Sequence, residues 1–233
     1  MQVSVLGPFE VRRNGVVSTP SAPKLRRVLA LLAVHSNTVV RTDRLIEELW
    51  EDRPPFSAMT TLQTYVYQLR KLHQMDSGAP APGQGSDLGD GKPALHTTPN
   101  GYTLLLPPDA LDSARFAQLA ERGRATFAAG EVEPAARLLA EALQLWRGPA
   151  LVDVGVGPVL QSAVVWLDEL HNSVVEQRID ANLALGRHQE LIGELTVLAA
   201  DRPTHEGLQA KLIISLYRCG RRSEALQVYH RAR

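Results

Sequence analysis

The 233-residue sequence has one cysteine, no net charge and no long apolar run, and each shortage excludes a class of protein. The single cysteine, Cys219, cannot form an internal disulfide framework, so a reducing cytosol is the expected compartment. The longest apolar run, residues 28–34, has seven residues, whereas a membrane span needs about 20. The N-terminal residues lack the basic start of a signal peptide. We therefore expect a cytoplasmic globular protein that does not contact a membrane.

Signatures of catalysis are also missing. The seven histidines show neither HExxH spacing nor a pairing with cysteine, so no metal site is predicted. Gly83, Gly85 and Gly89 lie in a Gly/Pro/Ser/Asp-rich stretch and do not connect a strand to a helix, which argues against a nucleotide cofactor. No serine lies in a GxSxG pattern. We predict that the protein is not an enzyme and has no cofactor.

The net charge of zero conceals a difference between the two ends of the chain. Residues 1–75 hold ten Lys or Arg and six Asp or Glu, an excess of four positive charges. Residues 107–233 hold fourteen Lys or Arg and sixteen acids, an excess of two negative charges. The N-terminal part is therefore the candidate for binding a polyanion, and the C-terminal part for binding proteins.

Residues Ser57 to Met75 have the pattern of one amphipathic helix. Its apolar side contains Leu62, Tyr65, Val66, Leu69 and His73. No acid occurs between Asp52 and Asp76, so nothing on this helix would repel a polyanion. Its outward hydroxyls, amides and cations are side chains that reach base edges and phosphates. The alternatives are a nucleic-acid recognition helix and an ordinary solvated helix face.

The flanking segments predict a winged helix-turn-helix. Alternating apolar residues over 3–17, with Asn14-Gly15 between them, indicate two or three short antiparallel strands. Helices are expected from Pro23 and from Thr42. Segments 94–98 and 102–106 flank Pro99-Asn100-Gly101, which indicates a hairpin wing. In such a fold the third helix enters the major groove and the wing touches the neighbouring backbone.

Residues 76–92, before the wing, read as a flexible loop, and from Asp109 onward the pattern predicts helices only. Gly186 and Gly220 occupy matching positions in LALGRHQEL and YRCGRRSEAL, 34 residues apart, which is the tetratricopeptide period. The segment around Gly130 is a more divergent third copy. The last copy stops at Arg233 within its second helix, so we expect the repeat region to be truncated there. Helical periodicity also predicts that Trp50, Trp146 and Trp166 are core residues.

Ordered segments along nearly the whole chain resemble the Streptomyces antibiotic regulatory proteins. They are PKLRRVLALLAVHSNTVVRTDRLIEELWEDRPPFSAMTTLQTYVYQLRKL, TTPNGYTLLL, ALDSARFAQL, EALQLWRGPAL, DANLALGRHQEL and LIISLYRCGRRSEALQVYHRAR. The resemblance implies a mainly α chain with a small β component. An OmpR-type winged helix over residues 1–106 would precede a tetratricopeptide-like bacterial transcriptional activation domain over residues 107–233.

The same resemblance implies a nucleoid-associated activator of antibiotic or secondary-metabolite genes. It would bind as a homodimer to direct repeats of double-stranded promoter DNA near the −35 element. It would then recruit RNA polymerase holoenzyme through the sigma subunit. The loop by which OmpR-type domains touch polymerase corresponds here to Glu51, Asp52, Arg53, Pro54, Pro55 and Phe56.

Three groups of residues are the candidate DNA contacts. Thr60, Gln63, Thr64 and Tyr67, near the start of the recognition helix, are expected to read bases, with Arg70 and Lys71 nearer the backbone. Cations at the start of the first helix are candidate phosphate anchors, and the wing tip is a candidate backbone contact. These two groups are Lys24, Arg26 and Arg27, and Asn100, Gly101 and Tyr102. The alternative function is a tetratricopeptide-type scaffold whose winged helix contacts proteins, because a fold does not fix a function.

Overall fold

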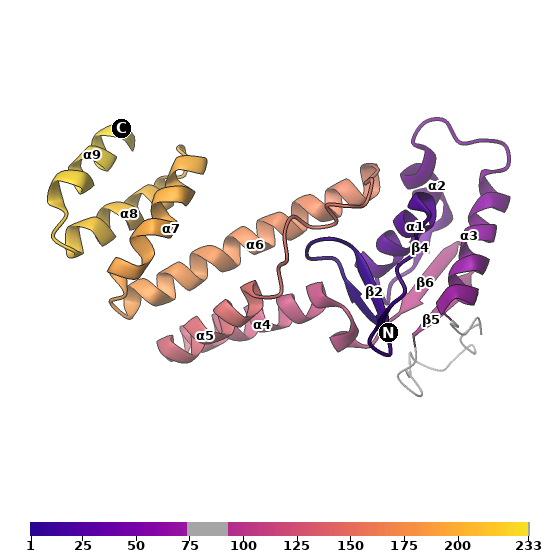
Figure 1. Ribbon diagram of the computed structural model, residues 1–233, viewed down its shortest axis with the longest axis horizontal. Coiled ribbons are helices and arrows are strands. Elements are labelled where there is room, and N and C mark those ends of the chain that lie inside the picture. Colours follow the sequence, from indigo (N-terminus) through magenta and orange to yellow (C-terminus); the bar gives the residue numbers. More distant parts are fainter. Residues whose placement is uncertain (74–92, 233) are drawn as a thin grey trace. The chain divides into compact units, whose positions relative to one another are not determined.

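The computed structural model describes residues 1–73 and 93–232 (Figure 1). The flexible loop expected over residues 76–92 lies outside the described residues. The chain divides into two compact units, and each unit combines two separate stretches of sequence. The first comprises Met1–Gln118 and Ala142–Asn172, and the second comprises Leu119–Glu141 and Ser173–Arg233. The fold is mainly α with two small sheets, which confirms the predicted class.

The first unit begins with an antiparallel sheet of three short strands. They are β1 (Gln2–Ser4), β2 (Glu10–Arg13) and β3 (Val16–Val17), in the order β1-β2-β3. Val3 lies opposite Val11, and both side chains are buried. Asn14 and Gly15 form the turn between β2 and β3 with φ of 49° and 80°. Both residue types tolerate positive φ, so the Asn-Gly pair correctly predicted this hairpin turn.

Three helices and a second sheet complete the winged helix. The helices are α1 (Pro23–Val34), α2 (Thr42–Trp50) and α3 (Ala58–His73). The sheet has the order β4-β6-β5, with β4 (Val40–Arg41), β5 (Ala94–Thr98) and β6 (Gly101–Leu105). The core between them is aliphatic and contains Val28, Leu32, Leu45, Leu62, Leu69, Leu95 and Leu104, all fully buried. The predicted helix-turn-helix with a hairpin wing is confirmed.

The first unit extends past the 3₁₀ turn η1 (Pro108–Ala110). The carboxylate of Asp112 accepts hydrogen bonds from the amides of Val5 (2.8 Å) and Leu6 (3.1 Å). The Arg147 amide donates to the Leu6 carbonyl (2.8 Å). Burial raises the pKa of Asp112, while the amide hydrogen bonds and the nearby Arg147 act in the opposite direction. A functional boundary between residues 106 and 107 stays a prediction, because the fold of the first unit uses residues on both sides of it.

Glu48 on α2 holds the start of helix α6 (Pro158–Ala184). Its carboxylate accepts hydrogen bonds from the amides of Gly157 (2.5 Å), Val159 (3.0 Å) and Leu160 (2.9 Å). The side chain is completely buried. A side chain from another helix therefore satisfies amides that a helix start leaves without partners. A Cβ on Gly157 would lie 2.4 Å from the Glu48 carbonyl oxygen, so only glycine fits there.

The remaining helices, together with α6, form pairs, and a glycine turn joins the two helices of each pair. They are α4 (Asp112–Ala128), α5 (Val132–Leu143), α7 (His188–Asp201), α8 (Glu206–Arg218) and α9 (Arg222–Ala232). Gly130, Gly186 and Gly220 have φ of 83°, 77° and 78° between α4 and α5, α6 and α7, and α8 and α9. Left-handed glycine at a helix end is a common C-terminal cap. The three predicted repeat turns are thus confirmed, and the core of the second unit includes Ile179, Leu195 and Leu212.

The tryptophans correct one prediction about the core. Trp146 packs edge-on against Phe116 with ring centroids 5.6 Å apart, and Trp50 is partly buried. Trp166 is 58% exposed, so its assignment to the core is wrong. Helix α6 is long and its apolar residues are not confined to one face, so periodicity could not show which of them face solvent. In the described ranges 1–73 and 93–232, no helix has the length and apolar content needed to cross a membrane.

Candidate nucleic-acid interface

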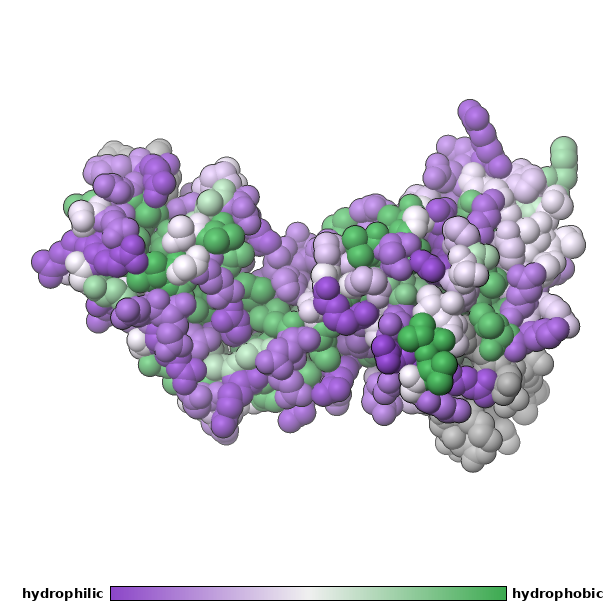
Figure 2. Space-filling model, viewed as in Figure 1, coloured by the Kyte–Doolittle hydropathy of each residue, from purple (hydrophilic) through white to green (hydrophobic). Residues whose placement is uncertain are grey.

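Helix α3 presents one buried side and one exposed polar side. Leu62, Val66 and Leu69 are buried at helical spacing and fix the orientation of the helix. The exposed polar residues are Thr60, Gln63, Thr64, Tyr67, Gln68 and Lys71, and the apolar side chains of Met59 and Leu72 are exposed as well. Figure 2 shows mostly pale and hydrophilic residues over this helix. The observed outward face matches the predicted one at Thr60, Gln63, Thr64, Tyr67 and Lys71. It also contains Gln68, which its spacing from Thr64 and Lys71 indicates, whereas the predicted contact Arg70 is half-buried.

Most of this exposed face is not engaged with the rest of the protein. Gln63, Tyr67, Gln68 and Lys71 have no hydrogen-bond or ion-pair partner within the described part of the chain. Tyr67 is 65% exposed. Only the hydroxyl of Thr64 has an internal partner, since it donates to the Thr60 carbonyl oxygen at 2.9 Å. The amide, phenol and ammonium groups are thus available to an external partner.

Arg70 has a different place from the other predicted contacts on α3. It is half-buried, its Nε donates to the Leu95 carbonyl (2.9 Å), and its Nη2 donates to the Thr97 hydroxyl (2.8 Å). Both acceptors belong to β5, so Arg70 links α3 to the wing hairpin (Figure 1). The guanidinium therefore positions the hairpin beside the helix, and its use as a phosphate contact would require giving up these bonds.

The cations at the start of α1 are also occupied. Lys24 lies over the ring of Trp50 at 4.9 Å, and Arg26 forms an ion pair with Asp153 at 3.1 Å. Arg27 donates to the Glu48 carbonyl oxygen at 3.1 Å. Their role as phosphate anchors stays a prediction, and each cation would have to leave a partner within the first unit to contact DNA. The sequence alone does not show whether a cation at the start of a helix pairs with a residue from a distant segment.

At the wing tip, only one of the three predicted residues is exposed. Asn100 is exposed, and its carbonyl oxygen accepts from the Thr42 amide at 3.0 Å. Gly101 and Tyr102 are buried, and they pair with Arg41 and Val40 of β4. A side chain at Gly101 would meet the β4 backbone at 2.0 Å. The wing-tip contact with DNA stays a prediction, and Asn100 is the one of its three residues whose side chain is exposed, because Gly101 and Tyr102 are buried in the sheet.

Arg41 beside the wing tip is an exposed cation that is not among the predicted DNA contacts. Its guanidinium makes a two-point contact with the Asp43 carboxylate, at 3.1 and 2.8 Å. Hydrogen bonding from Arg41 lowers the pKa of Asp43, so this carboxylate keeps its charge in mildly acidic solution. Asp43 and Glu47 lie close to Arg41 and Arg44 in the sequence, so the net charge of this segment does not indicate a cationic site.

The segment between α2 and α3 is exposed throughout. Every residue from Glu51 to Phe56 is exposed, and Phe56 is fully exposed. The Arg53 amide donates to the Trp50 carbonyl, and the Ala58 amide donates to the Pro55 carbonyl, at 3.0 and 2.9 Å. Two short turns and two consecutive prolines therefore hold the loop, which presents an aromatic ring to solvent. Within the described residues, no group of three or more His, Cys, Asp or Glu could hold a metal ion.

Two family models match the chain, and together they cover most of it. Residues 111–233 match the bacterial transcriptional activator domain, and residues 18–81 match the C-terminal domain of transcriptional regulatory proteins.

Proteins with similar sequences are regulatory proteins. Regulatory protein DnrI of Streptomyces peucetius is 42% identical over 100% of this chain and 84% of DnrI. Regulatory protein AfsR of Streptomyces coelicolor is 35% identical over 98% of this chain, which is 21% of AfsR. The solved structure of Mycobacterium tuberculosis EmbR in complex with a low-affinity phosphopeptide is 34% identical with a TM-score of 0.85. That match covers 99% of this chain and 58% of the EmbR chain, so the sequence spans most of DnrI but only parts of AfsR and EmbR.

Proposed function

Because the chain belongs to the Streptomyces antibiotic regulatory protein family of transcriptional activators, we propose that it activates transcription by binding specific promoter sequences through α3. The observation that carries the proposal is the exposed face of α3, which is free of acids and largely free of internal partners. Near the start of the helix, Gln63 can grip adenine with its amide and Thr60 can pack against a thymine methyl. Lys71, two turns beyond Thr64, would contact phosphates at the edge of the groove.

The wing supports the same mode of binding. Arg70 fixes β5 against α3, and the β4–β6 pairing fixes the hairpin tip, so helix and wing keep a constant spacing. The exposed Asn100 at the tip would then touch the sugar-phosphate backbone next to the groove that α3 enters. Because helix and wing are already held in this arrangement, less conformational entropy is lost when DNA binds.

Salt titrations of DNA binding test the proposal. The probe is a fluorescent duplex from the promoter region next to the protein's own gene, and the control is a scrambled duplex of equal length. We expect a preference for the promoter duplex and an affinity that falls with salt, with about 0.9 added to the log-log slope for each phosphate neutralised. A slope near zero together with equal affinity for both duplexes would contradict DNA binding and favour the scaffold function.

The direct-repeat arrangement and the homodimer belong to the same proposal. One winged helix presents one α3, so it reads one half-site, and two copies are required to read two repeats. Titration of duplexes carrying one or both repeats should give one and two bound copies, respectively, in analytical ultracentrifugation. One copy on the two-repeat duplex at saturation would contradict the dimer.

The loop from Glu51 to Phe56 is proposed as the contact for RNA polymerase, through its sigma subunit. Phe56 supports this role, because exposed aromatic rings are frequent anchors of protein interfaces. Phe56→Ala should lower activated transcription with purified holoenzyme several-fold and leave promoter affinity unchanged. Phe127→Ala, which removes a 38% exposed ring from α4, is the matched control. Normal activation by Phe56→Ala would contradict the assignment of the loop.

Control of antibiotic or secondary-metabolite genes is the proposed biological output. It is supported by membership of the family and by the similarity to DnrI, which covers the entire chain. Mapping of bound sites across the genome, followed by transcript measurement in a deletion strain, tests this output. Binding sites confined to genes of primary metabolism would contradict it.

A further inference from the structure

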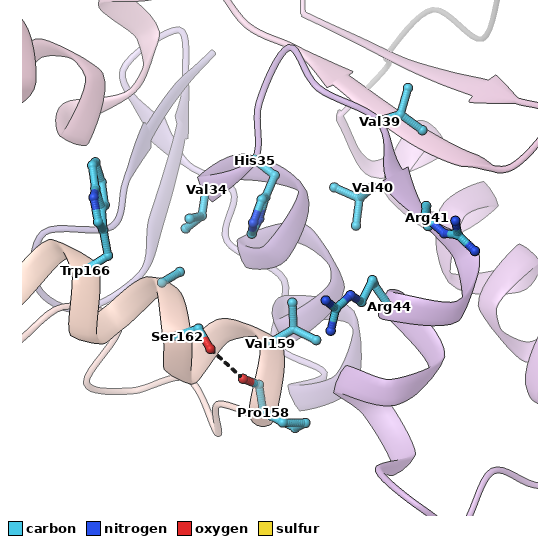
Figure 3. A pocket seen from close by; sticks show the side chains of 11 residues that line it. Val34, His35, Val39, Val40, Arg41, Arg44, Pro158, Val159, Ser162 and Trp166 are labelled. Atoms are coloured by element: carbon cyan, nitrogen blue, oxygen red, sulfur yellow. Dashed lines mark hydrogen bonds between the residues drawn. The ribbon is translucent and has the colours of Figure 1, made fainter.

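A hollow of about 580 Å³ lies against the side of the winged helix that faces the start of α6, within the first compact unit (Figure 3). Its walls come from the end of α1, from β4, from the start of α2 and from the first turns of α6. The volume is in the range of about 300–1,000 Å³ that small-molecule sites occupy. None of the proposed DNA or polymerase contacts lines this hollow.

The middle of the hollow is apolar. Val34, Val40 and Val159 contribute aliphatic side chains, and Figure 3 shows them around the same space. His35 also faces it, with its Nδ1 placed 3.1 Å from the Leu31 carbonyl oxygen. Because a carbonyl oxygen can only accept, the Nδ1–H of His35 donates this hydrogen bond, which orients the ring. These surfaces can accept the hydrocarbon body of a ligand.

Arg44 supplies positive charge on one side of the hollow (Figure 3). Its guanidinium pairs with Glu47, one turn away at 3.0 Å, and both side chains are largely exposed, while Asp43 is a second nearby carboxylate. An exposed pair of this kind contributes little to stability, so a bound anion can replace Glu47. No Asp or Glu is among the described residues that line the hollow. The charge of the lining therefore favours an anion.

Trp166 supplies an aromatic surface at the other side of the hollow (Figure 3). The indole is 58% exposed, and it stacks on no other aromatic ring in the described part of the chain. Tryptophan side chains are mostly buried in proteins, because burial removes a large apolar surface from contact with water. A flat ring lying on Trp166 would bury that surface.

We propose that this hollow binds a small aromatic acid, with its rings against Trp166 and the valines and its anionic group on Arg44. The planar guanidinium matches a carboxylate or sulfonate through two parallel hydrogen bonds, and an aromatic pair gains from offset stacking. The ligand would touch α1, α2 and α6 together. This inference does not rest on the proposed function, because it concerns binding to the free protein.

The test is a fluorescence titration with 8-anilinonaphthalene-1-sulfonate, an aromatic anion, and with N-phenyl-1-naphthylamine, which has the same rings without the sulfonate. Arg44→Gln should weaken binding of the anion about tenfold and leave the neutral probe unchanged, because it removes a charge-assisted hydrogen bond. Trp166→Ala should weaken both probes. Both positions are exposed, so the variants should fold, and circular dichroism melts check this.

A second apolar groove makes a control necessary. Ile214, Tyr217 and Leu226 line it on α8 and α9, and Tyr217→Ala removes part of its wall without touching the hollow. Binding of both probes should be the same in Tyr217→Ala as in the unaltered protein. Ala163→Leu, which fills the hollow from α6, should block both probes. If Arg44→Gln and Trp166→Ala bind the anion normally, or if only Tyr217→Ala weakens it, the proposed site is wrong.

Discussion

Helices α1 and α3 belong to the same winged helix and carry side chains of similar chemistry, but they use them differently. On α1, the cationic groups of Arg26 and Arg27 contact acceptors on other elements of the first unit. On α3, Gln63 and Lys71 are exposed and have no partner among the described residues. Polar and cationic side chains thus hold the fold together on α1, whereas on α3 they remain available to an external partner. The candidate interface is therefore distinguished by side chains without internal partners more than by the number of its cations.

The difference also explains why Arg70 resembles the α1 cations more than its neighbour Lys71. Arg70 points from α3 to β5 and uses the fork of its guanidinium on two acceptors. Lys71 is one residue further on and exposed. One step along a helix turns a side chain by about 100°, which is enough to move it from the packed hairpin to solvent.

The largest effect is expected where the fold depends on a side chain of α2. Glu48→Ala would leave three helix-start amides without an acceptor and should lower the free energy of unfolding by about 3 kcal/mol. Urea unfolding measures this change. The exposed neighbour provides the control, because Glu47→Ala should cost less than about 1 kcal/mol. Equal costs for the two variants would refute the structural role of Glu48.

A smaller but more selective effect is expected on the exposed face of α3. Gln63→Ala should weaken binding to the specific operator by about 1–3 kcal/mol and leave binding to scrambled DNA and the unfolding free energy unchanged. Competition titrations with both duplexes measure the specificity ratio. Gln227→Ala, an exposed glutamine on α9, is the matched control. An unchanged ratio for Gln63→Ala would move base reading to the wing at Asn100.

Lys71 should affect all DNA about equally. Because an ammonium on phosphate carries no sequence information, Lys71→Ala should weaken specific and scrambled duplexes alike and reduce the log-log salt slope by about one unit. The measurement is the affinity of each duplex over a series of salt concentrations. A slope that does not change would show that Lys71 stays in solvent when DNA is bound.

The smallest effect is expected from a cation on α1. Arg26→Gln removes the partly exposed pair with Asp153, so it should cost about 0.5 kcal/mol of stability and leave the salt slope unchanged. Comparison with Lys71→Ala by the same titrations sharpens the contrast between α1 and α3. A slope reduced as much as in Lys71→Ala would mean that Arg26 leaves Asp153 for phosphate.

Local patterns in the sequence predicted much of the fold correctly. The Asn14-Gly15 turn and the buried side of α3 follow from turn chemistry and helical spacing. The glycines at 186 and 220 follow from the repeat period. Each of these features depends on residues close together in the chain, where sequence carries most of its information.

The features that the sequence could not predict depend on distant partners. The pairing of Arg26 with Asp153 joins residues 127 positions apart, and the Glu48 carboxylate meets amides more than 100 positions away. A buried glutamate looks like any other acid in a sequence until the amides that surround it are known. For the same reason, the exposure of Trp166 and the burial of Tyr102 depended on the packing of α6 and β4.

The Glu48 carboxylate also constrains how parts of related regulators can be exchanged. A chimaera that joins this winged helix to another activation region near residue 106 would separate Glu48 from the amides at residues 157–160. A join after residue 172 keeps glutamate, glycine and the first turns of α6 from one parent. The smallest interchangeable module of this regulator therefore contains the winged helix together with the start of α6.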